Sequence, residues 1–121
     1  MAQRANRAAV IDSQATLDLG ERYVYRDQAR VLAYLATHPY LVDILREADP
    51  EIAKRFGEAT TVTLAVEDDV DQIGVETLWG FIRTPLPAHD ARDLLRHFDR
   101  EWWIARSWDV REELGLDIRF G

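Results

Sequence analysis

The chain has 121 residues, a length typical of one domain with its own hydrophobic core. Hydrophobic residues make up 47% and charged residues 31%, as in ordinary globular proteins. There is no cysteine, which excludes disulfides, thiolate metal sites and cysteine nucleophiles. The formal net charge of −7 repels phosphate backbones, so we expect no nucleic-acid partner; the charge suits solubility or a basic protein partner.

The N-terminal residues have weak periodicity and carry no apolar signal segment. No apolar run reaches the roughly 20 residues that cross a bilayer, so we expect a cytoplasmic protein without membrane association. We expect residues 1–20 to form a flexible arm, in which residues 8–11 could add an edge strand. A single domain is then expected over residues 21–121.

Apolar residues at helical spacing predict helices that begin near Arg26, Pro39 and Asp49. The first helix should end before Pro39, because the residue before a proline avoids the α region. Asp49 and Pro50 have the pattern of an N-cap followed by a first-turn proline, and Gly57 is a natural helix end. The residues expected to be buried are Val31, Leu32, Leu35, Leu41, Ile44, Leu45, Ile52 and Phe56.

The period of the apolar residues then changes from 3.6 to 2, which predicts strands at 61–67 and 75–83 joined as a hairpin. One long helix is predicted over 88–107, and Leu116, Ile118 and Phe120 alternate in a closing strand. We therefore expect an α+β fold in the order α-α-α-β-β-α-β. Its sheet would have about three antiparallel strands, with the long helix packed on one face.

The aromatic residues of the second strand and of the long helix point to opposite sides. Leu78 and Ile82 share one side of the strand, while Trp79 and Phe81 share the other. On the helix, Trp102 falls on the apolar face and is expected in the core, whereas Trp103, about 100° further round, is expected at the surface. The apolar face would consist of Ala91, Leu94, Leu95, Phe98, Trp102 and Ala105.

A sheet covered on one face only would leave one of these two pairs of the strand at the surface, and exposed aromatic patches usually mark interfaces. The equally weighted alternative is that the N-terminal arm or a helix covers the second face. We therefore name Trp79, Phe81 and Trp103 as candidate protein-interaction residues.

Acidic residues crowd the predicted hairpin turn at 67–71. A cluster of carboxylates could bind a divalent cation, but the run lacks the spacing and the central glycine of a calcium loop. A solvated turn, whose like charges discourage edge-to-edge pairing, is the preferred interpretation. Asp68, Asp69 and Asp71 are the residues expected to attract a basic partner.

Potential metal ligands on the long helix are spaced four residues apart, at His89, Asp93, His97 and Glu101. Ligands at this spacing converge on zinc in metalloenzymes, but ordinary surface pairing explains the pattern equally simply. Neither serine lies near a histidine in a catalytic motif, and the six glycines are too scattered for a phosphate loop. We therefore expect no enzymatic activity, no metal and no cofactor, and keep a metal-dependent activity on this stripe as a third alternative.

Over residues 28–121 the chain resembles a family of short bacterial proteins, frequent in cyanobacteria, that has no established activity. The shared features are the helix YLATHPYLVDILREA, the strands TLAVEDD and FIRT, and the motif FDREWW at 98–103, an FDxxWW core. The resemblance implies a partner to a neighbouring gene product, as in antitoxin- or immunity-like pairs. The leading expectation is thus a non-enzymatic, acidic, neutralising interaction protein, and the alternative is a homodimeric accessory protein.

Overall fold

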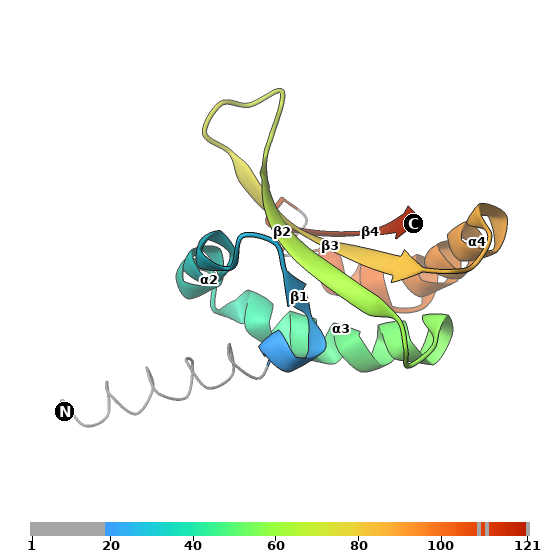
Figure 1. Ribbon diagram of the computed structural model, residues 1–121. Coiled ribbons are helices and arrows are strands. Elements are labelled where there is room, and N and C mark those ends of the chain that lie inside the picture. Colours follow the sequence, from blue (N-terminus) through green and yellow to red (C-terminus); the bar gives the residue numbers. More distant parts are fainter. Residues whose placement is uncertain (1–18, 109, 111, 121) are drawn as a thin grey trace.

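The structure, a computed structural model, describes residues 19–108, 110 and 112–120 (Figure 1). Residues 19–22 are helical, so most of the expected arm lies outside the described residues, as does the possible strand at 8–11. The elements, in chain order, are β1 (Val24–Tyr25), α2 (Gln28–Thr37), α3 (Tyr40–Phe56), β2 (Thr61–Asp68), β3 (Glu76–Thr84), α4 (Ala88–Phe98), the π-helical turn η1 (Asp99–Trp103), α5 (Ile104–Ser107) and β4 (Leu114–Phe120).

The sheet has four strands in the order β1-β2-β3-β4. The predicted α+β class and the antiparallel β2–β3 hairpin are confirmed, but the expectation of a three-stranded, wholly antiparallel sheet is wrong. The short strand β1 was not predicted, and β1–β2 and β3–β4 are parallel. Both parallel pairs follow from their connections, because a helical crossover returns the chain in its original direction. Helices α2 and α3 form one crossover, and α4 to α5 form the other.

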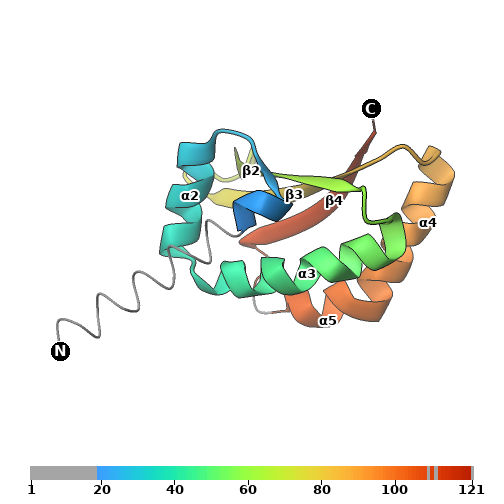
Figure 2. The same ribbon diagram turned by 60° about the horizontal axis from the view of Figure 1, so that its bottom comes forward.

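The helices cover one face of the sheet, with α3 running across it and α2 and α4 towards its two ends (Figures 1 and 2). The core lies between these layers. Its fully buried side chains include Leu41, Leu45, Leu64, Leu78, Ile82 and Phe98. We call the opposite side of the sheet the outer face; no described helix lies over it.

Helix α3 runs through the point at which two helices were predicted to meet. Pro50 lies inside the helix, on its exposed face, so the predicted helix boundary at Asp49 is wrong. A proline there removes one backbone hydrogen bond, but the apolar face that runs from Leu41 to Phe56 holds both halves on the core. Gly57 ends the helix as predicted, with a positive φ of 103°.

The predicted long helix contains an unpredicted π-helical turn, η1. The Ile104 N–H donates to the Asp99 carbonyl, five residues earlier rather than four. This widened turn rotates the following residues about the helix axis. As a result Trp103, and not Trp102, is the next core residue after Phe98, and it is only 8% exposed. Trp102 is half-buried and Ala105 is exposed. The prediction that Trp102 is the core tryptophan and Trp103 the surface one is therefore wrong.

None of the helices in the described part of the chain has the length and apolar character that crossing a membrane requires.

Candidate interaction surfaces

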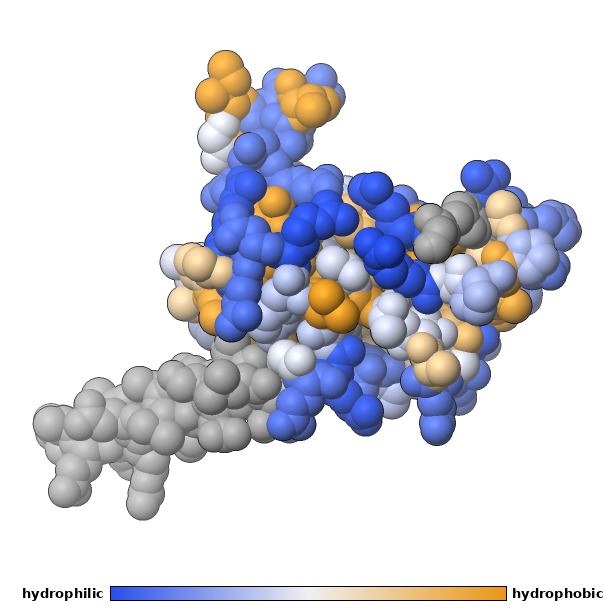
Figure 3. Space-filling model, viewed as in Figure 1, coloured by the Kyte–Doolittle hydropathy of each residue, from blue (hydrophilic) through white to orange (hydrophobic). Residues whose placement is uncertain are grey.

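The β2–β3 hairpin extends beyond the rest of the molecule, as Figure 1 shows. Its connection, residues 69–75, carries Val70 and Ile73, whose side chains are both fully exposed. In Figure 3 hydrophobic groups stand out at this tip above a largely hydrophilic body. The acidic residues of this turn were predicted as interaction residues, but the apolar residues among them were not.

Arg30 of α2 holds the base of the hairpin. Asp68 and Glu76 face each other across the two strands, where like charges repel. The Arg30 Nη2 lies 2.8 Å from Asp68 Oδ1 and 2.7 Å from Glu76 Oε2, so one positive charge lies between the two negative ones and offsets part of their repulsion. Asp68 is therefore paired within the fold, but its side chain is still 76% exposed, so its expected contact with a partner stays a prediction.

The other two predicted acidic residues lie beside the apolar tip. The Asp69 N–H donates to the Val75 carbonyl at 2.8 Å, and its Oδ1 accepts from the Asp71 N–H at 2.8 Å. Gly74 completes the turn with a positive φ of 84°. Asp69 and Asp71 are both exposed, so their carboxylates flank Val70 and Ile73.

The outer face carries Trp79 and Phe81 as predicted, with stacked rings 6.1 Å apart. Trp79 is half-buried because its ring lies over Gly115, where a Cβ atom would come within 2.5 Å of Trp79 Cζ3. Phe81 is only 5% exposed, so it is not the open aromatic anchor that was predicted. No described helix lies over this face, and most of the N-terminal arm lies outside the described residues.

Arginine side chains cover Phe81. The guanidinium carbon of Arg119 lies 4.1 Å from the ring centroid and that of Arg26 lies 5.6 Å from it. Glu67 Oε1 is shared between them, at 3.7 Å from Arg26 and 4.0 Å from Arg119. Sequence reasoning missed this cluster, although strand alternation marks it: Arg83 and Arg119 each follow an inward-facing isoleucine.

Trp103, the remaining predicted interaction residue, belongs to the core and does not join the outer face. Its ring stacks with that of Trp102 at 6.0 Å, under the cover of the helical layer. It therefore contributes to stability and not to a contact surface.

The histidine stripe of the long helix does not form a compact site. His89 Nε2 lies 3.5 Å from Asp93 Oδ2, while Glu101 turns to Arg55, with 3.5 Å between Oε1 and Nε. Within residues 19–108 and the described part of 110–120, no three His, Cys, Asp or Glu residues are placed to hold a metal ion. The widened turn after Phe98 explains the divergence, because it displaces Glu101 from the line of the histidines.

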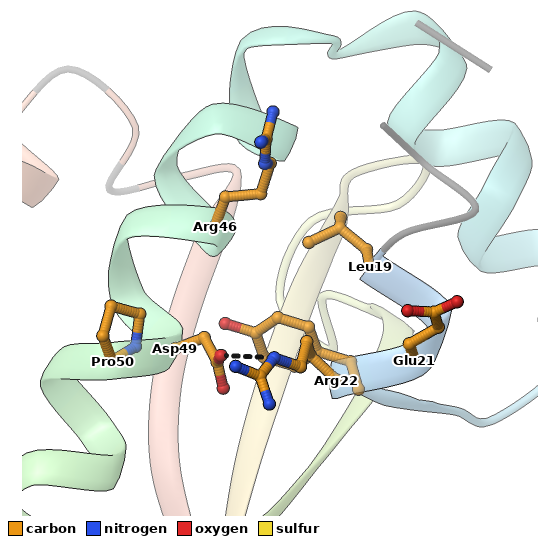
Figure 4. Close-up of a pocket in the computed structure, with 7 residues that line it drawn as sticks. Leu19, Glu21, Arg22, Arg46, Asp49 and Pro50 are labelled. Carbon is orange, nitrogen blue, oxygen red and sulfur yellow. Dashed lines mark ion pairs between the residues drawn. The ribbon is translucent and has the colours of Figure 1, made fainter. Parts of the chain in front are cut away.

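A surface pocket of about 390 Å³ lies between the helical turn at 19–22 and α3 (Figure 4). An ion pair between Arg22 Nε and Asp49 Oδ2, 3.0 Å apart, spans it. The Tyr23 hydroxyl donates to the Leu45 carbonyl, and burial raises the pKa of this phenol far above its ordinary value. Two of the charged groups that line the pocket are thus paired with each other, and its buried phenol is not activated as a nucleophile. Its lining comprises Leu19, Glu21, Arg22, Tyr23, Arg46, Asp49 and Pro50.

In comparisons with known proteins, no family model matches the chain, and no curated protein or solved structure is significantly similar to it.

Proposed function

We propose that the protein is a non-enzymatic interaction protein that binds a partner through the tip of its β2–β3 hairpin. The observation that supports this is the full exposure of Val70 and Ile73 at the end of a projecting element. Large apolar side chains gain free energy when an apolar surface covers them, by about 1.5–3 kcal/mol each. The turn itself is ordered by its own hydrogen bonds, so little conformational entropy is lost when it docks.

The charges beside the tip define the chemistry of the partner. Asp69 and Asp71 would repel an anionic lipid surface, so an apolar cleft in a protein fits the tip better than a membrane does. A basic rim around that cleft would complement the two carboxylates and accelerate association. A small acidic protein that occupies the cleft of a basic partner agrees with a neutralising role, as in antitoxin- or immunity-like pairs.

Site-specific crosslinking tests this proposal, because the chain has no cysteine of its own. A Gln72→Cys variant carrying a thiol-linked photo-crosslinker places the probe between Val70 and Ile73. We expect crosslinking to one discrete partner in extracts of the source cells. The yield should fall at least about tenfold when Val70→Ser and Ile73→Ser are added, since both apolar contacts are lost.

Two controls define the result. Ile104→Ser removes an apolar side chain that is 52% exposed on α5 and should leave the crosslink intact. A Glu58→Cys variant carries the same probe on the exposed loop after α3 and should not label the same protein. Equal yields from positions 58 and 72, or yields insensitive to the tip substitutions, would contradict the proposal.

A further inference from the structure

The surface that the hairpin requires is present on the chain itself. A complement to the tip must be apolar at its centre and basic at its rim. The outer face has the half-buried Trp79 ring at its centre and Val24, 54% exposed, at its edge. Arginines from β3, β4 and the segment after β1 surround them: Arg26, Arg83 and Arg119.

The outer face carries more positive charge than its own carboxylates balance. Arg83 and Arg119 are direct partners across β3 and β4, where like charges repel. Glu67 is shared between Arg26 and Arg119, and Asp117 Oδ1 accepts the Ile118 N–H at 2.8 Å. A cationic cluster of this kind, on a chain of net charge −7, is a local complement to the acidic tip.

We propose that the occupant of the outer face is the hairpin tip of a second copy of this chain. The inference rests on the proposed function for the tip contact, and it names a second copy rather than a separate basic protein as the partner. Val70 and Ile73 of one copy would cover Trp79 of the other, while Asp69 and Asp71 would lie against Arg83 and Arg119. The result is a homodimer in which each copy contributes a tip and a face.

The position of the hairpin favours a reciprocal arrangement. In Figure 1 it rises from the sheet on the side away from α3, which is the side of the outer face. Two copies that face each other across a twofold axis can therefore each extend a tip over the other. Such an interface uses the same surface on both copies and closes at the dimer. It also contains two tip contacts, which helps a small element reach the roughly 1,200 Å² typical of stable interfaces.

Sedimentation equilibrium of the purified chain tests the dimer. We expect the wild type to dimerise with increasing concentration, and Val70→Ser with Ile73→Ser to raise the dissociation constant at least about tenfold. Two charge-reversal variants test which surfaces meet. One variant carries Asp69→Lys with Asp71→Lys in the tip, and the other carries Arg83→Glu with Arg119→Glu in the outer face. Each variant places like charges in both contacts of the dimer, so each alone should be monomeric.

An equimolar mixture of the two charge-reversal variants should form a heterodimer. In the mixture every tip meets a face of opposite sign, lysine against glutamate and aspartate against arginine. Restoration also shows that both variants are folded, which matters because Arg119 packs on Phe81. The same mixture prepared with Val70→Ser and Ile73→Ser in both chains is the matched control and should stay monomeric.

The outcomes separate the two proposals. A wild type that is monomeric at every concentration, or a mixture that fails to pair when both variants melt cooperatively, overturns the dimer. If the probe at position 72 nevertheless labels another protein in a tip-dependent manner, the proposed function stands and the homodimer falls. If the tip substitutions change neither sedimentation nor crosslinking, both proposals are wrong.

Discussion

Trp103 and Trp102 show how one backbone hydrogen bond decides the role of a side chain. The bond from the Ile104 N–H to the Asp99 carbonyl places Trp103 in the core and leaves Trp102 half-buried against Phe98, with ring centroids 5.6 Å apart. Trp103→Ala should therefore reduce the free energy of unfolding by about 3–5 kcal/mol, the usual range for a buried aromatic. Trp102→Ala should cost clearly less. Urea unfolding of both variants measures the difference, and the reverse ranking would disprove the assigned helical phase.

Asp99, at the start of the same turn, is a source of pH dependence. Burial, and secondarily the nearby Asp117, raise the pKa of its carboxyl above the ordinary value. Its Oδ1 is buried and has no hydrogen-bond partner in the described structure. Because the folded state holds this proton more tightly than the unfolded state does, Asp99 destabilises the fold once the pH rises above the unfolded-state pKa, near 3.9. The penalty is complete when the pH exceeds the raised pKa of the folded state.

Asp99→Asn should therefore increase the melting temperature at pH 7, and the increase should shrink as the pH approaches 4. Melting curves of wild type and variant across this range measure the effect. Glu58→Gln, which neutralises an exposed carboxylate, is the control and should show no comparable trend. An Asp99→Asn variant that is no more stable at pH 7 than at pH 4, relative to wild type, would contradict this account.

At the scale of elements, the sequence was informative wherever one local pattern acted alone. Local pattern was enough to predict the apolar alternation in β2 and β3, the helix end at Gly57 and the shared side of Leu78 and Ile82. That this side of β3 faces the core is seen only in the structure. Pro50 was misleading because tertiary packing outweighs the loss of one helical hydrogen bond. Strand β1 has only two residues and carries no periodicity of its own, so only its pairing with β2 reveals it.

The candidate surfaces were predicted only in part, because local periodicity does not show which elements pack together. Alternation placed Trp79 and Phe81 on one side of β3, but it could not reveal that arginines from other elements would converge on Phe81. The parallel pairing of β3 with β4 brings Arg119 into that position, and a crossover of this kind leaves no local mark on either strand. Likewise, only the projection of the hairpin shows that Val70 and Ile73 stay uncovered.

For the whole molecule, opposite electrostatic effects act at different ranges. Two copies with a net charge of −7 repel each other over long distances, whereas in the proposed dimer the tip and outer face would attract at contact. Salt separates these effects, because the screening length falls from about 30 Å at 10 mM to about 8 Å at 150 mM. The long-range repulsion is then largely screened, while close contacts between partly buried groups persist.

The proposed dimer should consequently be most stable at intermediate ionic strength. We expect its dissociation constant to decrease from 10 mM to about 150 mM salt as the net repulsion is screened, and to increase towards 1 M as the contacts between carboxylates and arginines weaken. Sedimentation equilibrium across this salt series measures both the decrease and the increase of the dissociation constant. Asp43→Asn with Glu58→Lys lowers the net negative charge at exposed positions outside the tip and the outer face. These changes should weaken the dependence of the dissociation constant on salt below about 150 mM and leave its dependence at higher salt unchanged. A dimer that is tightest at the lowest salt in both proteins would show that net repulsion plays no part.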